Sequence, residues 1–193
     1  TQSLYFVDIL GMSIHKYVPS TKKHTHVKLD KKVSFIVPVK GHSDRFVISM
    51  EREIVMITWD GVSSTLGKTE TIAIVDEDYE TNRINDAKVD PLGNLWAGTM
   101  ATDADHVKGT HITGSLYNLG SDKQVKKHLS NVCVSNGLAW SKDLKKMYYI
   151  DSLLRRIDQF DYDSKTLSIS SRQTLFTFEK HHVEGYPDGQ TID

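Results

Sequence analysis

The chain has little cysteine, no excess of either charge and no long apolar run. Cys133 is its only cysteine, which excludes an internal disulfide framework and is compatible with a reducing compartment such as the cytoplasm. The 24 basic and 25 acidic residues give a net charge of −1. The chain therefore lacks the excess of positive charge that favours binding to nucleic acid or an anionic membrane. Apolar runs such as residues 33–39 are far shorter than the roughly 18 residues of a membrane span. We therefore expect a cytoplasmic protein that binds neither nucleic acid nor membrane.

Helical patterns and several familiar catalytic motifs are also missing. No window of eleven or more residues carries the i, i+3, i+4, i+7 apolar stripe of an amphipathic helix. The sequence contains no Gly-x-Ser-x-Gly elbow and no glycine-rich phosphate loop, which removes the usual signatures of serine hydrolases and nucleotide-binding proteins. What remains is a series of short strand patterns separated by turn signals such as Asp60-Gly61. The sequence predicts an all-β fold.

The strand patterns repeat along the chain. Four short segments share an aromatic residue near their start, recur about every forty to fifty residues and are each followed by a second strand pattern. This interval is the span of a four-stranded propeller blade. The sequence therefore predicts blades in which the four aromatic residues occupy equivalent strands. These residues are Tyr5, Phe46, Trp96 and Tyr148.

Three polar residues share a second register of the same repeat. Asn85, Asn136 and Asp188 each open a strand-like segment, and they lie about fifty residues apart. Equivalent positions of successive blades converge near the axis of a propeller, so we expect the three side chains to begin innermost strands and to point toward one site. Amide and carboxylate oxygens are hard donors that suit divalent cations such as Ca²⁺, Mg²⁺ or Mn²⁺. Convergence would indicate a metal or a polar substrate.

Other polar clusters suggest weaker alternatives. His24 and His26 lie on one face of a strand and could bind zinc, but no third ligand is evident in the sequence and the flanking Lys22-Lys23 would repel a cation. The pair His181-His182 is interpreted as part of a surface loop. The acidic run at residues 76–80 lacks the spacing of an EF-hand and is interpreted as a solvated loop.

Longer motifs resemble a known family. Four segments resemble the signatures of the family of regucalcin (SMP-30), gluconolactonase and luciferin-regenerating enzyme, and the resemblance extends over essentially the whole chain. These segments are residues 83–100, 135–141, 148–152 and 187–189. Residues 51–54, 143–151 and 176–180 resemble the luciferin-regenerating branch of the family more than the regucalcin branch.

The resemblance implies a six-bladed β-propeller of roughly 300 residues, of which this chain covers about four blades. Residues 1–193 are then expected to be a single incomplete domain, a fragment with both ends inside a blade. The family holds one divalent cation (Ca²⁺, Zn²⁺, Mn²⁺ or Mg²⁺) with a Glu, an Asn and an Asp. The Asn maps onto Asn136 and the Asp onto Asp188, which is also the implied catalytic proton shuttle. No residue of this chain matches the Glu, so the chain by itself is expected to be inactive.

The family's substrate-contacting residues map onto Arg83, Asn85 and Asp103. The implied reaction is conversion of oxyluciferin toward 2-cyano-6-hydroxybenzothiazole, with hydrolysis of a sugar lactone or calcium binding without turnover as alternatives. Two residues depart from the family pattern. Ala87 stands where glycine is usual, which would strain the backbone if a positive φ were needed there, and Asp103 is shorter than the Glu of regucalcin.

Overall fold

The computed structural model describes residues 2–102 and 112–193, and the secondary structure there is β-strand apart from one short 3-10 turn, η1 (Ser152–Leu154). The chain divides into two compact units, the first comprising residues 1–75 and the second residues 76–193. None of the described residues forms a helix that is long and apolar enough to cross a membrane. The prediction of an all-β fold is confirmed.

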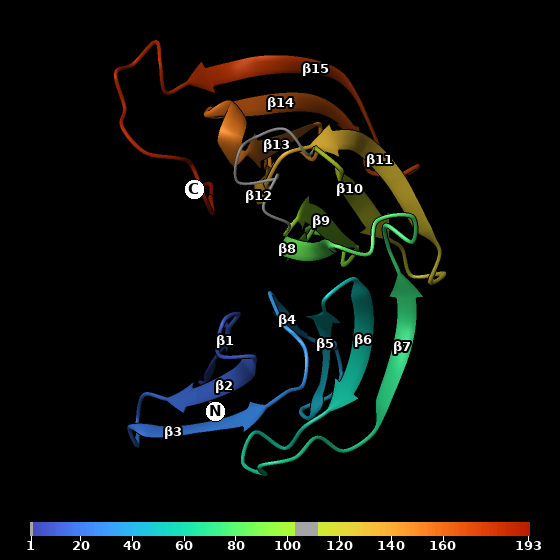
Figure 1. Ribbon diagram of the computed structural model, residues 1–193, viewed down its shortest axis with the longest axis vertical. Coiled ribbons are helices and arrows are strands. Elements are labelled where there is room, and N and C mark those ends of the chain that lie inside the picture. The colour runs from blue at the N-terminus through green and yellow to red at the C-terminus, as the bar shows by residue number, and fades with distance from the viewer. Residues whose placement is uncertain (1, 103–111) are drawn as a thin grey trace. The chain divides into compact units, whose positions relative to one another are not determined.

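The first unit contains two antiparallel sheets whose strands lie side by side in chain order (Figure 1). The three-stranded sheet consists of β1 (Leu4–Asp8), β2 (Ser13–Val18) and β3 (Lys23–Lys28). The four-stranded sheet consists of β4 (Ile36–Pro38), β5 (Arg45–Met50), β6 (Glu53–Thr58) and β7 (Thr69–Ile74). Short hairpins join most neighbours, as expected for meander sheets.

The second unit contains two four-stranded antiparallel sheets, also with neighbouring strands in chain order (Figure 1). One consists of β8 (Asn82–Val89), β9 (Leu95–Ala101), β10 (Gly114–Leu119) and β11 (Val125–Val132). The other consists of β12 (Ser135–Trp140), β13 (Lys146–Asp151), β14 (Arg156–Asp163) and β15 (Ser168–Thr177).

Each unit has its own apolar core between its two sheets. In the first unit, Ile14 and Val27 of the three-stranded sheet pack with Phe46 and Ile57 of the other sheet, and Trp59 completes this cluster. In the second unit, the core is an aromatic group. Its members are Trp96, Trp140, Tyr149, Phe160 and Tyr162, together with Leu116, Val132, Leu138 and Met147. The three tryptophans of the chain are therefore core residues, as burial of large aromatic side chains favours.

The four repeated aromatic residues lie on equivalent strands, as predicted. Tyr5, Phe46, Trp96 and Tyr148 are on β1, β5, β9 and β13, and each of these strands is followed in its sheet by the next two strands of the chain. The detail differs in β13, where the fully buried aromatic side chain is Tyr149 and Tyr148 is only half-buried. Successive residues of a strand face opposite sides, so the fourth sheet presents the neighbouring residue to the core.

A close approach between β9 and β12 positions the polar residues of the second unit. A Cβ atom on Gly98 of β9 would lie 1.6 Å from Ser135 Oγ and 2.3 Å from Ser135 Cβ. Glycine is therefore required at residue 98, because any side chain would push β12 away from β8 and β9. The Ser135 hydroxyl accepts a hydrogen bond from Tyr149 Oη at 2.9 Å, which holds the serine at this contact.

His128 makes the stability of the second unit depend on pH. Its ring packs on Trp96, and Nε2–H donates to Asn118 Oδ1 at 2.7 Å. Burial, with a smaller contribution from the Lys126 charge, lowers the pKa of His128 to about 4 from its ordinary 6.5. The unfolded chain therefore binds a proton more readily than the folded one, and stability is lost as the pH falls from about 6.5 to about 4.

We expect the free energy of unfolding to drop by about 2 kcal/mol over this pH range, after allowance for the partial exposure of the ring. Urea unfolding at a series of pH values measures the drop, and His128→Gln, which keeps a donor for Asn118, should flatten it. His42→Gln is the control on an exposed histidine of the first unit. An undiminished slope in His128→Gln would assign the pH dependence to other groups.

Candidate functional site

Strands β8 and β12 bring two of the predicted site residues into direct contact. Asn85 of β8 donates through Nδ2 to Asn136 Oδ1 at 3.1 Å and to the Ser135 carbonyl oxygen at 2.9 Å. The pairing register of both strands is interrupted at this place, between Ile84 and Asp86 in β8 and between Asn136 and Leu138 in β12. Such bulges turn side chains away from the regular alternation. The two amides therefore meet where the pairing register of both strands is irregular.

The orientation of the Asn136 amide is fixed by a short chain of hydrogen bonds. Nδ2 donates to Ser152 Oγ at 2.6 Å, and Ser152 Oγ donates to the Pro187 carbonyl oxygen at 2.6 Å. Asn136 is only 7% exposed, and this chain leaves its Oδ1 facing Asn85. A carbonyl oxygen has two lone pairs, so Oδ1 can accept from Asn85 and still offer an oxygen to a cation.

Asp188 comes close to these residues through its backbone. Its carbonyl oxygen accepts from Gly137 N at 3.1 Å, and Gln190 Nε2 donates to the Gly137 carbonyl at 2.8 Å. A Cβ atom on Gly137 would lie 2.7 Å from the Asp188 oxygen, so glycine is needed for this approach. Lys88 of β8 adds a hydrogen bond from Nζ to the Gln190 carbonyl at 3.1 Å.

The expected placement in the strands is only partly correct. Asn85 and Asn136 lie within β8 and β12, and Asn85 does not begin its strand. Asp188 is exposed and belongs to no strand, because the backbone of its segment bonds β12 only around Gly137 rather than along a ladder.

A second carboxylate lies in the same neighbourhood. Burial raises the pKa of Asp86, and the negative charge of Asp188 raises it further, while Lys88 opposes the shift. Two carboxylates that repel each other present hard oxygen donors, and a divalent cation between them relieves the repulsion. Hard oxygen donors of this kind fit a divalent cation such as Ca²⁺. Within residues 2–102 and 112–193, no three His, Cys, Asp or Glu side chains form a ready-made metal centre by themselves.

The remaining predicted residues are Arg83 and Asp103. Arg83 lies on β8 two residues before Asn85, with Nη1 donating to the Ile84 carbonyl at 3.0 Å and Nη2 approaching Met100 Sδ at 3.3 Å. Asp103 lies outside the described residues. Ala87 does not have a positive φ, so alanine is accommodated without backbone strain at this position.

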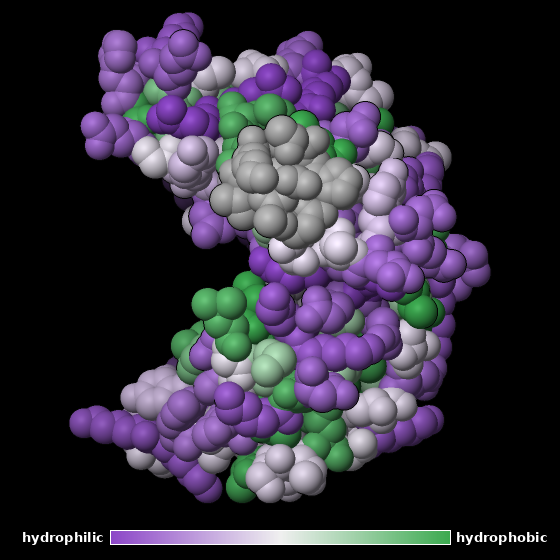
Figure 2. Space-filling view, viewed as in Figure 1, coloured by the Kyte–Doolittle hydropathy of each residue, from purple (hydrophilic) through white to green (hydrophobic). Residues whose placement is uncertain are grey.

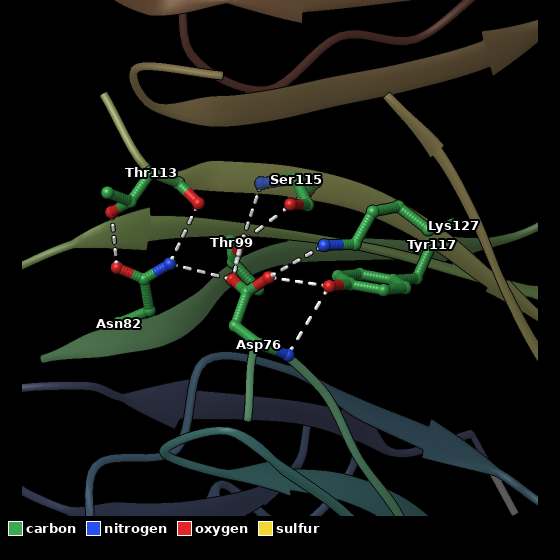
Figure 3. Close-up of polar contacts among 7 residues, drawn as sticks. All are labelled: Asp76, Asn82, Thr99, Thr113, Ser115, Tyr117 and Lys127. Carbon is green, nitrogen blue, oxygen red and sulfur yellow. Dashed lines mark hydrogen bonds and ion pairs between the residues drawn. The ribbon is translucent and has the colours of Figure 1, made fainter. Parts of the chain in front are cut away.

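A separate polar cluster in the second unit surrounds Asp76 (Figure 3). The Asp76 carboxylate is buried and accepts from Tyr117 Oη at 2.5 Å, Thr99 Oγ1 at 2.5 Å and Asn82 Nδ2 at 2.7 Å. Lys127 Nζ lies 3.9 Å away. Asp76 is thus not part of a solvated loop, although residues 77–80 of the same acidic run are exposed. A carboxylate that is enclosed by donors in this way ties the start of the second unit to its first sheet.

Cys133 is a structural residue. It is buried, its backbone N–H donates to Asp151 Oδ2 at 2.9 Å, and burial together with Asp151 raises the pKa of the thiol to about 11. A thiol with so high a pKa is not a nucleophile at neutral pH.

Comparison with known proteins agrees with the resemblance. The family model described as "SMP-30/Gluconolactonase/LRE-like region" matches residues 1–193. The chain belongs to this family. A solved luciferin-regenerating enzyme is 61% identical to the chain with a TM-score of 0.95, and the match covers 100% of this chain and 62% of that one.

Regucalcin is a more distant relative in the family. The protein of Xenopus laevis is 41% identical over 191 residues, which cover 99% of this chain and 61% of the relative. A structure of a calcium-binding protein, regucalcin, from Agrobacterium tumefaciens has a TM-score of 0.80 at 20% identity over 97% of this chain and 59% of that chain, and this likeness shows the fold alone. The chain spans about three fifths of the length of these relatives. The order of strands in the sheets and the family together place the chain in the β-propeller fold. Each sheet corresponds to a blade.

Sequence reasoning missed two residues near Asn136 and Asp188, namely Ser152 and Asp86. Asp86 directly follows Asn85, and the bulge that brings it near Asp188 has no sequence signal. Ser152 follows the aromatic strand β13, and its role depends on contacts with Asn136 and Pro187 that are distant in the chain.

Proposed function

We propose that this chain supplies the metal-binding and substrate-binding part of a luciferin-regenerating type of enzyme, which converts oxyluciferin toward 2-cyano-6-hydroxybenzothiazole. The 61% identity to a luciferin-regenerating enzyme over the whole chain carries the proposal, since identity to the Xenopus regucalcin is 41%. The contact between Asn85 and Asn136 supports it, because it joins a substrate-binding and a metal-binding residue of the implied site. We also propose a cytoplasmic location.

In this proposal, Asn136 and Asp188 hold one divalent cation (Ca²⁺, Zn²⁺, Mn²⁺ or Mg²⁺). A cation held there would supply the chemistry that divalent ions give hydrolases, namely polarisation of a substrate carbonyl and a lowered pKa of bound water. Asp188 is exposed, so its carboxylate can accept a proton from water and return it to the leaving group. Asn85 has both Nδ2 hydrogens engaged at Ser135 and Asn136, so Oδ1 is what it offers to a substrate hydroxyl. Arg83 and Asp103 are the further proposed substrate contacts.

A lactonase or a calcium-binding protein without turnover is the second candidate. Its support is the curated relatives, which include regucalcins at 38% identity in human and 41% in Xenopus laevis. The same residues, Asn136 and Asp188, would hold the ion. Only the substrate, or the absence of one, distinguishes the two candidates.

A chimera tests the proposal directly. The 193 residues replace the matching segment of the luciferin-regenerating enzyme, of which they cover 62%, so that the rest of that chain supplies what this one lacks. We expect chelator-sensitive consumption of oxyluciferin, and a loss of about 10³-fold, or about 4 kcal/mol, in Asp188→Asn. Asp122→Asn, at an exposed turn residue, is the control. The 193-residue chain alone should show no turnover.

The other outcomes decide between the candidates. Turnover of a sugar lactone without turnover of oxyluciferin would establish the lactonase. Saturable Ca²⁺ binding with turnover of neither substrate would establish the calcium-binding protein. Full activity in Asp188→Asn would contradict the assignment of the site in both cases.

A further inference from the structure

Three histidines form a row on one face of the sheet β1-β2-β3, in the first unit. Strand pairing sets His15 of β2 opposite His26 of β3, and His24 lies two residues earlier on the same face of β3. The ring of His15 is nearly parallel to both others, with centroids 5.1 Å from His24 and 5.3 Å from His26. His24 and His26 are exposed and His15 is half-buried, and Figure 2 shows mostly hydrophilic side chains over β2 and β3. An ion can therefore reach the row from solvent.

Two nitrogens of this row are already at the spacing of neighbouring metal ligands. His15 Nδ1 and His24 Nε2 are 2.9 Å apart and share a hydrogen bond. Two metal–nitrogen bonds of about 2.0–2.1 Å that meet at a right angle hold their nitrogens about 2.9 Å apart, whereas a tetrahedral angle needs about 3.4 Å. The nearly parallel rings, with centroids 5.1 Å apart, place the two nitrogens face to face along this hydrogen bond, so both rings must turn before their lone pairs converge on one ion.

A neighbouring hydroxyl prepares His15 as a ligand. Its other nitrogen, Nε2, lies 2.9 Å from Ser13 Oγ. With the proton on Nε2 donated to Ser13, the lone pair of Nδ1 faces His24, which is the arrangement that orients many metal-binding histidines. Binding then requires that His24 carry its proton on Nδ1 instead of Nε2 and that both rings turn toward the ion. Both rings stay neutral, and no net proton is released.

We propose that His15 and His24 chelate a divalent cation of the Cu²⁺ or Ni²⁺ type, with His26 as the nearest additional imidazole and water in the remaining positions. This site is separate from the oxygen-donor site of Asn136 and Asp188. The softer imidazole donors select late transition metals, and Cu²⁺ binds most tightly in the usual order of affinities.

The charges around the row are mixed, and Lys22 and Lys23, which precede His24 in the sequence, disfavour a cation. Asp8 of β1 and Lys28 of β3 act on His15 in opposite directions, and Lys28 Nζ is held at the Gly11 carbonyl at 2.8 Å. Burial and the two neighbouring imidazoles lower the pKa of His15, so this ring is neutral at pH 7 and available as a ligand.

The test is titration of the 193-residue chain with CuCl₂ at pH 7.5, followed by calorimetry and by electron paramagnetic resonance, which counts bound nitrogens. We expect one tight site with at least two imidazole nitrogens, weakened tenfold or more by His15→Gln and by His24→Gln, and two- to fivefold by His26→Gln. His24 is exposed, so its replacement leaves the fold intact, and circular dichroism verifies this for each variant.

Two controls separate the site from other candidates. The double variant His181→Gln, His182→Gln removes an exposed consecutive pair of the second unit, and Asp188→Asn alters the oxygen-donor site. Both should leave the tight Cu²⁺ site unchanged. Tight binding that survives His24→Gln, that is lost with His181 and His182, or that shows oxygen ligands only would overturn the proposal. An absence of tight binding would overturn it equally.

Discussion

Replacement of Asp76 by asparagine should destabilise the second unit by about 3 kcal/mol. The Asp76 carboxylate is buried and receives hydrogen bonds from Asn82, Thr99 and Tyr117, so all three neighbours are donors (Figure 3). An asparagine of the same shape presents an NH₂ group to at least one of them and removes the charge that strengthens the bonds. Breaking a buried, charged network of this kind costs about 3–5 kcal/mol.

Asparagine is chosen because of the backbone at this residue. Asp76 has a φ of 49°, in the left-handed region that asparagine tolerates nearly as well as aspartate. The change therefore tests the carboxylate and adds little backbone strain, which an alanine would not achieve. Urea unfolding measures the loss, and Asp122→Asn, where the carboxylate accepts the Gln124 N–H in an exposed turn, is the control. Equal stability of Asp76→Asn and Asp122→Asn would show that the cluster is not stabilising.

The same measurement can include Tyr117. Burial raises the pKa of Tyr117, and its hydrogen bond to Asp76 raises it further, so the phenol remains a donor throughout the neutral range. Tyr117→Phe removes one donor without adding another, and we expect it to cost less than Asp76→Asn, about 1–2 kcal/mol.

The repeat could be predicted from the sequence because core positions recur with the blade. Trp96 is fully buried at the position that its spacing from Phe46 indicates. The contact between Asn85 and Asn136 follows from the same register, since equivalent residues of adjacent sheets approach each other. The repeat period and the residue types were sufficient to predict the burial of Trp96 and the contact between Asn85 and Asn136, because both can be read directly from the sequence.

The features that the sequence did not predict depend on long-range contacts. The sequence predicts that Asp76 belongs to a solvated acidic run, whereas in the structure residues of β8, β9 and β10 donate hydrogen bonds to its carboxylate. His15 joins His24 only through the pairing of β2 with β3. The bulge at Asn85 lies where β8 contacts β12, and no residue type in the sequence is diagnostic of it.

Replacement of Gly98 by alanine should be the second large perturbation, with a loss of about 3 kcal/mol in the stability of the second unit. The new methyl group would coincide with the side chain of Ser135, whose Cβ would be only 2.3 Å away. Because a Cβ is fixed to its backbone, β12 must move away from β9, and overpacking of this kind costs about 1–3 kcal/mol or more. The movement also separates Asn136 from Asn85, so the proposed metal site should weaken with the fold.

A double variant shows whether the contact with Ser135 is the cause. Ser135→Gly removes both atoms that the new methyl group would meet, and the next nearest atom, Leu116 Cδ1, is 3.6 Å away. Ser135→Gly by itself leaves Tyr149 without its acceptor and should cost about 1–2 kcal/mol. In Gly98→Ala, Ser135→Gly, the loss should be smaller than the sum of the two single losses by about 2 kcal/mol, measured as a coupling energy in urea unfolding. Gly189→Ala, which adds a methyl group with no atom within 4 Å, is the control. Additive losses would show that Gly98 is needed for some reason other than the approach of β12.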